Sequence, residues 1–338
     1  MNIVFLIGNG FDLNLGLKTG YPQFYEWYLK QESPSVLVSK LKDQLKRDRS
    51  EDKNNWSDLE MWLGTYSKNW NNRDEVHEVF FDINDKLREY LKSVSAISEE
   101  KMDQYQKVFK EDLINLLKKL TQNKYRQITN YIAINNTVTI NFIIFNYTWT
   151  IESLLGLKNR SYKGNTLQII NDRHYTEVNR LYHIHADLDS EELILGVNDS
   201  SQLSNESFQG DVTIESMLVK PTTTYQKEDM IDSACETLIS KSDIICLYGC
   251  SMGLSDKKWW KLIADHLMNS SSFLLKYSYA EEKPVRITDK VLLEKKLREE
   301  FEESIKELEG DDASKVYEKI KNKILVLPHY TLFNFLKS

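Results

Sequence analysis

Near its start this chain of 338 residues reads Asn2-Ile3-Val4-Phe5-Leu6-Ile7-Gly8-Asn9-Gly10-Phe11-Asp12, and this stretch determines the architecture that we predict. Its first six residues form a short apolar run rich in β-branched side chains, which is typical of a strand covered on both faces. Two glycines follow, and a helical pattern begins after them. Such a turn lets backbone N–H groups approach a phosphate. The order of strand, glycine turn and helix therefore predicts an α/β fold. The first loop either borders a phosphate-binding site or is only a tight strand-to-helix turn capped by Asp12.

Further apolar runs predict the rest of a mostly parallel sheet. They are Val138–Phe145, Leu181–His185 followed by the short run Leu193–Leu195, Asp243–Tyr248, and a late run, Ile324–Leu327, that would form an edge strand.

The chain between the first two runs is helical in pattern, because apolar residues recur there at helical spacing. The predicted helices are Tyr21–Lys30, Ser35–Arg47, Asp58–Tyr66, Asp74–Val94 and Glu99–Asn123. A crossover between parallel strands needs far less chain than this. We therefore expect a helical insertion at residues 21–135 and an α/β core formed by residues 1–20 and 136–338.

Two later segments have simpler interpretations. The polar, aperiodic stretch Asn198–Met217 predicts a mobile loop, and the charged run Lys290–Gly310 predicts a solvated helix.

Composition narrows the class of protein. The net charge of −7 excludes a wholly basic nucleic-acid footprint, so nucleic acid is not an expected partner. Three cysteines without metal-site spacing predict neither a disulfide framework nor a zinc site. No segment has the length and hydropathy of a membrane span, and the first apolar run is too short for a secretion signal. These features predict a cytoplasmic protein with no membrane partner.

Polar residues follow two more of the predicted strands. Asn146 and Thr148 come directly after Val138–Phe145, while Gly249, Ser251 and Asp256 follow Asp243–Tyr248. Ligands of open α/β sheets bind at the carboxyl ends of the strands, so we expect these residues to line one site. The alternative is that they cap the helices that follow.

The segment Tyr182-His183-Ile184-His185-Ala186-Asp187 permits three interpretations. Alternate residues of a strand share a face, so His183, His185 and Asp187 could ligate a metal. One imidazole could instead act as a general base near neutral pH. Both histidines could also be purely structural. We predict that no metal is required, because no further ligand cluster supports these three residues.

Taken together, these motifs resemble the abortive-infection AbiH family of phage-defence proteins. The resemblance rests on the following stretches: Gly8–Asp12 with Gly16–Thr19 and Phe24, Asn55–Glu60 with Leu63-Gly64, Phe145–Thr148, His183–His185, and Gly249–Gly253 with Asp256.

A looser resemblance is to the sirtuins, on Gly8-Asn9-Gly10, Asn146 and His185-Ala186. It implies that the glycine loop holds the pyrophosphate of NAD, that Asn146 orients the nicotinamide ribose or the attacking water, and that His185 is the general base. Water attack would then cleave the N-glycosidic bond and release nicotinamide. Two residues depart from the sirtuin pattern: Thr148 replaces an acidic residue, and Ala186 replaces the usual glycine. A third departure is that Pro22-Gln23-Phe24 matches a sirtuin element only at altered spacing, and the zinc-binding cysteines of the deacetylases are absent from the sequence.

The resemblances imply a Rossmann-like or sirtuin-like α/β protein with a helical insertion after the first strand. It would be a phage-defence effector that binds or hydrolyses NAD, with a phage product, an effector protein or a second copy as partner. The alternatives are a non-catalytic nucleotide sensor that controls a partner, and a metal-assisted nucleic-acid hydrolase. The predicted catalytic residues are Asn146 and His185, and the predicted nucleotide-binding residues are Gly8, Asn9, Gly10, Phe11, Asp12, Thr148, Gly249, Ser251 and Asp256.

Overall fold

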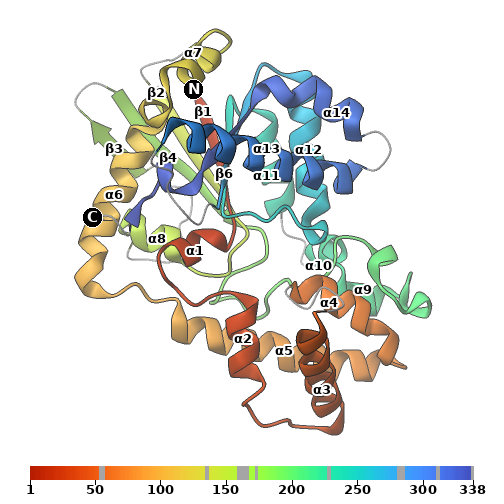
Figure 1. Ribbon diagram of the computed structural model, residues 1–338. Coiled ribbons are helices and arrows are strands. Elements are labelled where there is room, and N and C mark those ends of the chain that lie inside the picture. The colour runs from red at the N-terminus through yellow and green to blue at the C-terminus, as the bar shows by residue number, and fades with distance from the viewer. Residues whose placement is uncertain are drawn as a thin grey trace.

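The computed structural model describes residues 1–52, 58–133, 137–157, 167–171, 174–226, 230–279, 286–309 and 313–335. Within them the chain forms a seven-stranded sheet flanked by helices on both faces (Figure 1). The strands are β1 Asn2–Ile7, β2 Thr137–Ile144, β3 Leu167–Asn171, β4 His174–His183, β5 Ile244–Tyr248, β6 Phe273–Ser278 and β7 Ile324–Pro328.

The strand order is β3-β4-β2-β1-β5-β6-β7, and all neighbours are parallel except β3 and β4. Counted along the chain, the six parallel strands have the order 3-2-1-4-5-6 of the doubly wound dinucleotide-binding fold. The order reverses at β1, which pairs with β2 on one side and β5 on the other. The prediction of a Rossmann-like, mostly parallel α/β sheet is confirmed.

Alternation along β1 explains why both faces of the sheet are covered. Ile3, Phe5 and Ile7 belong to the apolar core on one face, while Val4 and Leu6 belong to the core on the other. A strand whose two faces are both buried needs apolar residues at every position. The predicted runs at β1, β2, β5 and β7 are confirmed for this reason, and β7 is the edge strand that we expected.

Three strand predictions need correction. The run Leu181–His185 is the end of the longer strand β4, which stops at His183, so His185 lies beyond it. Leu193–Leu195 forms no strand, because its leucines pack into the core of the helical layer instead. Both β3 and β6 were missed, and in β6 the apolar pattern is interrupted by Lys276.

Helices cover the two faces of the sheet (Figure 1). One face carries α6, α7 and α8, whose apolar side chains share a core with the sheet; the other carries α11, α12, α13 and α14. The bounds are α6 Glu99–Ile114, α7 Gln122–Thr129, α8 Thr150–Leu155, α11 Ile231–Ser240, α12 Lys257–Asn269, α13 Ile287–Glu309 and α14 Ala313–Ile320.

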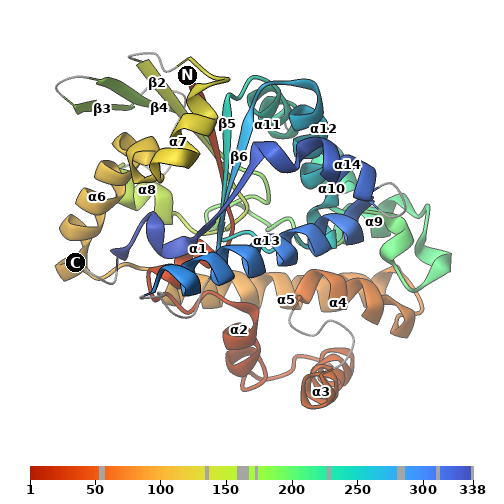
Figure 2. The ribbon, with the colours of Figure 1, turned by 45° about the horizontal axis from the view of Figure 1, so that its top comes forward.

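A second layer lies beyond the carboxyl ends of the strands. It contains α2 Tyr21–Tyr28, α3 Val36–Glu51, α4 Leu59–Tyr66, α5 Arg73–Val94, α9 Val212–Leu218 and α10 Lys220–Gln226, and the short helix α1 Gly10–Asn14 leads from β1 toward it. Figure 2 shows α13 running across the lower end of the strands, with α4 and α5 on its far side. Space between the sheet and this layer is where the candidate site lies.

The predicted helical insertion after β1 is present, since the regular elements described between β1 and β2 are all helices. Its helices pack in two places: α2–α5 form a core with residues 188–219, whereas α6 and α7 pack on the sheet. The domain limits proposed from the sequence stay a prediction.

Two other segments differ from the sequence-based expectation. The predicted loop Asn198–Met217 contains two short 3-10 helices and most of α9, because Leu203, Phe208 and Ile214 are buried. The predicted solvated helix is α13, and it buries Leu297 and Phe301. Gly310 lies outside the described residues. Among the helices that the structure describes, none has the length and apolar character needed to span a membrane.

Candidate functional site

A cavity of about 1550 Å³ lies at the carboxyl ends of β1, β2, β5 and β6. This is the edge of the sheet where doubly wound folds bind their ligands, and it includes the switch point beside β1. The turns after these strands form one wall, and α5 and α13 contribute apolar side chains to the others, including Leu87, Leu91, Leu293, Leu297 and Phe301. Sheet and helical layer together therefore enclose one site.

Most of the residues predicted from the sequence line this cavity. They are Gly8, Asn9, Gly10, Asn146, Thr148, His185, Gly249, Ser251 and Asp256. They come from four separate stretches of the chain, and the parallel topology brings those stretches to one edge.

Phe11 and Asp12 are exceptions, because α1 begins at Gly10 and turns both side chains away from the cavity. Phe11 is fully buried in the core of the sheet, with its ring edge-on to Tyr248. Asp12 is also fully buried and accepts a hydrogen bond of 2.6 Å from the Thr148 hydroxyl. Burial raises the pKa of Asp12 to about 6, although the bond from Thr148 opposes the shift. Both residues support the loop from behind and lie outside the cavity lining, and their role as ligand contacts stays a prediction.

The glycines serve a different purpose from the one predicted. The N–H of Gly8 donates to the carbonyl of Tyr248, and the N–H of Gly10 donates to the carbonyl of Gly249, both at 2.9 Å. A Cβ on Gly8 would lie 2.5 Å from the Gly249 oxygen. These glycines let the turns after β1 and β5 pack backbone to backbone. Their N–H groups are already used, which corrects the expectation that they approach an anion.

Gly249→Ala should therefore destabilise the fold. Gly249 has φ +71°, and an added Cβ would lie 2.4 Å from the Phe11 nitrogen. Overpacking and left-handed strain together should cost about 3 kcal/mol of unfolding free energy, measured by urea denaturation. The control is Gly16→Ala, at φ +82° with nothing within 4 Å, where only the conformational cost of roughly 1 kcal/mol is expected. Equal losses in the two variants would contradict the packing role.

Asn146 follows the end of β2, lines the cavity and has a buried polar atom without a partner among the residues that the structure describes. Its side chain is 6% exposed, and its Oδ1 atom has no hydrogen-bond partner in the part of the chain that the structure describes. Buried polar atoms are nearly always paired. An unpaired amide oxygen in a residue that lines a cavity is a candidate acceptor for a donor group on a ligand, which a small movement of the side chain would expose.

His183 holds this strand end in place and does not line the cavity. Its Nδ1 lies 2.9 Å from the Asn146 carbonyl oxygen, and its Nε2 lies 2.8 Å from Glu152 Oε1. Although burial opposes it, the Glu152 carboxylate raises the pKa of His183. This histidine is a positioning residue for the backbone of Asn146.

His185 lies past the end of β4, in a turn where Ala186 has φ +65°. Its Nε2 is 3.0 Å from Asp256 Oδ1, and its Nδ1 is 3.3 Å from the Phe145 carbonyl oxygen. The expected alignment of His183, His185 and Asp187 on one strand face is wrong, because the strand ends before His185. Asp187 instead accepts hydrogen bonds within its own turn, from Ser190.

No group of three or more His, Cys, Asp or Glu side chains in the described segments is placed to hold a metal ion. The two histidines have different partners, so the geometry gives no support to the metal-assisted hydrolase.

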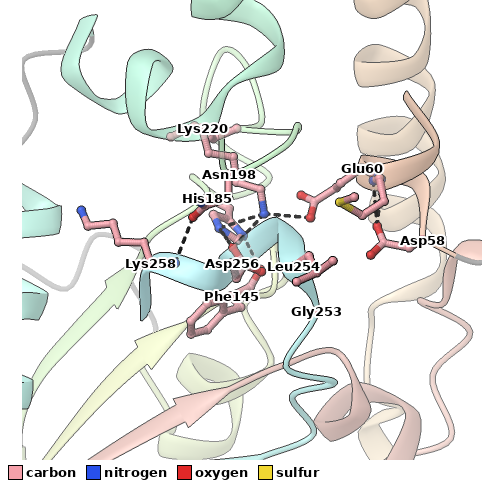
Figure 3. A network of polar contacts seen from close by, with 12 residues as sticks. Asp58, Glu60, Phe145, His185, Asn198, Lys220, Gly253, Leu254, Asp256 and Lys258 are labelled. Carbon is pink, nitrogen blue, oxygen red and sulfur yellow. Dashed lines mark hydrogen bonds and ion pairs between the residues drawn. The ribbon is translucent and has the colours of Figure 1, made fainter. Parts of the chain in front are cut away.

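A buried ion network joins His185 to the helical layer (Figure 3). Lys220, at the start of α10, places its Nζ 2.7 Å from Glu60 Oε2 on α4 and 2.8 Å from Asp256 Oδ1. The same ammonium is 3.5 Å from His185 Nε2. Burial opposes the charged forms, yet Lys220 and His185 together hold the pKa of Asp256 well below its usual range.

The other two carboxylates of this end of the cavity have a different environment. Burial raises the pKa of Glu60, and burial also raises the pKa of Asp58, which caps α4 by accepting from the N–H groups of Glu60 and Met61. Sequence reasoning did not assign Asp58, Glu60 or Lys220 to the site. Asp58 and Glu60 do lie in a stretch that carried the family resemblance, whereas Lys220 has no local signal, since its partners are remote in sequence.

Comparison with known families shows to which protein family the chain belongs. The model of the family "bacteriophage abortive infection AbiH" matches residues 4–279. This chain belongs to the AbiH family. The match begins in β1 and ends just after β6, so the strand ends that surround the cavity are all inside the AbiH region. Asn55–Ser57, part of the stretch by which the chain resembles AbiH proteins, lie outside the described residues. No curated protein matches the chain.

Proposed function

We propose that this AbiH protein acts in phage defence through a nucleotide bound in the strand-end cavity. NAD is the ligand we favour, and hydrolysis of its N-glycosidic bond is the reaction we favour. The observation that carries the proposal is the division of charge along the cavity.

One end of the cavity is acidic and the other is basic. Asp58, Glu60 and Asp256 line it near His185, and Lys220 is the ammonium paired with two of them. The wall formed by β6 and α13 contributes Lys276, Arg286 and Lys296, with Asp289 beside them. Among the lining residues that the structure describes, the first end carries three carboxylates, two of them paired with the Lys220 ammonium, and the second end carries three cations and one carboxylate.

This polarity fits a ligand that is anionic in one part and cationic in another. NAD has an anionic pyrophosphate and a positively charged nicotinamide ring, whereas ATP has no cationic part. The carboxyl ends of β2 and β6 are three strand positions apart, roughly 14 Å at about 4.8 Å per strand. A dinucleotide in an extended conformation can span this distance, so its two parts can lie at the two ends of the cavity. The sirtuin resemblance of Asn146 and His185-Ala186 supports the same ligand.

The residues at the acidic end suit cleavage of the bond to nicotinamide. As the electron pair of that bond leaves with the ring, positive charge develops on the ribose, and nearby carboxylates stabilise it. Asn146 would orient the ribose hydroxyls or the attacking water through its unpaired amide oxygen. The water oxygen bonds to the anomeric carbon, and His185 would accept the proton that the water loses.

A second function is nucleotide binding without cleavage. The contacts that His185 makes in this structure favour it. Both of its ring nitrogens lie beside oxygen acceptors, so neither has a lone pair directed to the cavity. The Thr148 hydroxyl is likewise already donated, to Asp12. In this function the nucleotide would switch a partner effector or a second copy of the chain.

The test uses the full chain and two measurements. Calorimetric titration should show NAD binding more tightly than ATP, and a nicotinamide assay should show release with or without a lysate of phage-infected cells. Binding without release in either condition would replace hydrolysis with the switching function. Absence of binding by NAD, ADP-ribose and ATP alike would refute the proposal.

A further inference from the structure

Lys276 is a buried lysine on the wall of the cavity. It lies near the end of β6, where Leu274 and Lys276 face one side of the sheet and Phe273, Leu275 and Tyr277 face the other. Its side chain is 7% exposed, and its Nζ donates to the carbonyl oxygen of Cys250. An ammonium therefore occupies a position where the strand pattern would place an apolar residue.

No carboxylate forms an ion pair with Lys276 among the residues that the structure describes. Burial accordingly lowers the pKa of Lys276. A buried charge is costly unless it is paired. The fold thus maintains a cation here that its own described side chains do not neutralise.

Two other buried lysines show how this chain normally satisfies such a charge. Lys220 has two carboxylate partners. Lys42, which is 4% exposed, donates to the carbonyls of Gln31 and Glu32 and lies 4.4 Å from the centre of the Tyr28 ring. Lys276 differs from both because its hydrogen-bond partner among the described residues is a single carbonyl, and because it alone of the three lines the cavity.

The ammonium of Lys276 lies beside the turn that follows β5, because it donates to the Cys250 carbonyl. Cys250 follows Gly249, the residue against which Gly8 and Gly10 pack at the switch point beside β1. The side chain therefore places a positive charge at the turn where the glycine N–H groups are already used. Ser251 lines the cavity at the same turn, and Arg286 adds a second cation to this wall.

We infer that Lys276 is the counter-charge for a phosphate or pyrophosphate group of the ligand, bound beside the Gly249–Cys250 turn. The inference rests on the proposed function in one respect, that the ligand is the nucleotide of this cavity. It goes further by naming which part of the ligand is recognised and by which residue.

The variant Lys276→Met tests whether the charge of Lys276 serves ligand binding or the stability of the fold. Methionine keeps most of the length and apolar surface of the side chain but removes the charge. If the charge serves the ligand, the free energy of unfolding should stay the same or rise, since a buried, unneutralised cation is lost. The affinity for inorganic pyrophosphate and for ADP-ribose should fall at least tenfold, measured by calorimetry, and the affinity for adenosine should change by less than threefold. Binding of pyrophosphate to the wild type should also weaken with added salt.

Lys42→Met is the matched control, because it removes a lysine of similar burial that does not line the cavity. Its affinity for pyrophosphate should equal that of the wild type. A loss of stability in Lys276→Met as large as that in Lys220→Met would show a structural charge and overturn the inference. Unchanged affinity of Lys276→Met for both anions, or no binding of either to the wild type, would overturn it as well.

The outcomes also distinguish this inference from the proposed function. If NAD binds the wild type and Lys276→Met equally well, the inference fails and the proposed function stands. If pyrophosphate binds in a manner that depends on Lys276 while NAD, ADP-ribose and ATP do not bind, the anion site is real, its source is a free phosphate compound, and the proposed function fails.

Discussion

Lys220→Met should lower the free energy of unfolding by about 3–5 kcal/mol, the cost of breaking a buried ion pair by removing one partner. The substitution leaves Glu60 and Asp256 buried, with the charge that offset them gone. Because Glu60 belongs to α4 and Asp256 precedes α12, the network joins the helical layer to the sheet, and its loss should also disorder the surroundings of His185. Urea denaturation of the full chain measures the stability.

Two comparisons make this expectation specific. The double variant Lys220→Met, Glu60→Gln should recover part of the loss, since it removes one of the two stranded carboxylates. Lys86→Met removes a lysine whose ion pair with Glu89 is at the surface, and it should cost less than about 1 kcal/mol. A Lys220→Met variant as stable as Lys86→Met would show that the network adds nothing to the stability of the fold.

The strands of this fold were predictable where burial on both faces left a continuous apolar signal. That is the case for β1 and β5, whose residues are all buried except Asn2 at the start of β1. It is not the case for β6, because Lys276 interrupts the apolar pattern. Leu193–Leu195 shows the opposite error, since a run of buried leucines in a helical layer has the same local pattern as a short strand.

The site was predictable where its residues follow strands. Gly8, Asn146 and Gly249 each come after an apolar run, and parallel topology brings such positions together. The buried charges were not predictable in this way, because the partners of Lys220 lie 160 and 36 residues away. The sequence does not distinguish a charged residue that is solvated from one that is paired inside the fold.

The hydrogen-bonding roles of individual atoms could not be predicted from the sequence either. The glycine N–H groups donate within the protein, and His185 is turned toward Asp256.

The position of His185 determines what hydrolysis would require of it. With Nε2 beside Asp256 and Nδ1 beside the Phe145 carbonyl, the ring must turn or move when the ligand binds so that one nitrogen can accept a proton. Asp256 orients the ring, and the Lys220 ammonium lies 3.5 Å from Nε2. Hydrogen bonds to catalytic groups often reach their working geometry only in the complex with substrate.

His185→Ala should therefore reduce release of nicotinamide from NAD by a factor of about 10² to 10⁴, the usual contribution of a general base. Affinity for ADP-ribose should change far less, because the inferred pyrophosphate position beside Lys276 is away from His185. His183→Ala is the matched control: it removes the neighbouring histidine, which contacts Glu152 and the Asn146 carbonyl and does not line the cavity. It should cost stability, since it leaves Glu152 buried without its partner, and it should slow turnover less than His185→Ala does. Single-turnover assays at matched folded fractions measure both effects.

If His183→Ala abolishes turnover while His185→Ala remains active, the base has been assigned to the wrong histidine. If both variants release nicotinamide at the wild-type rate, neither imidazole takes the proton, and the charge of the surrounding carboxylates must account for the rate.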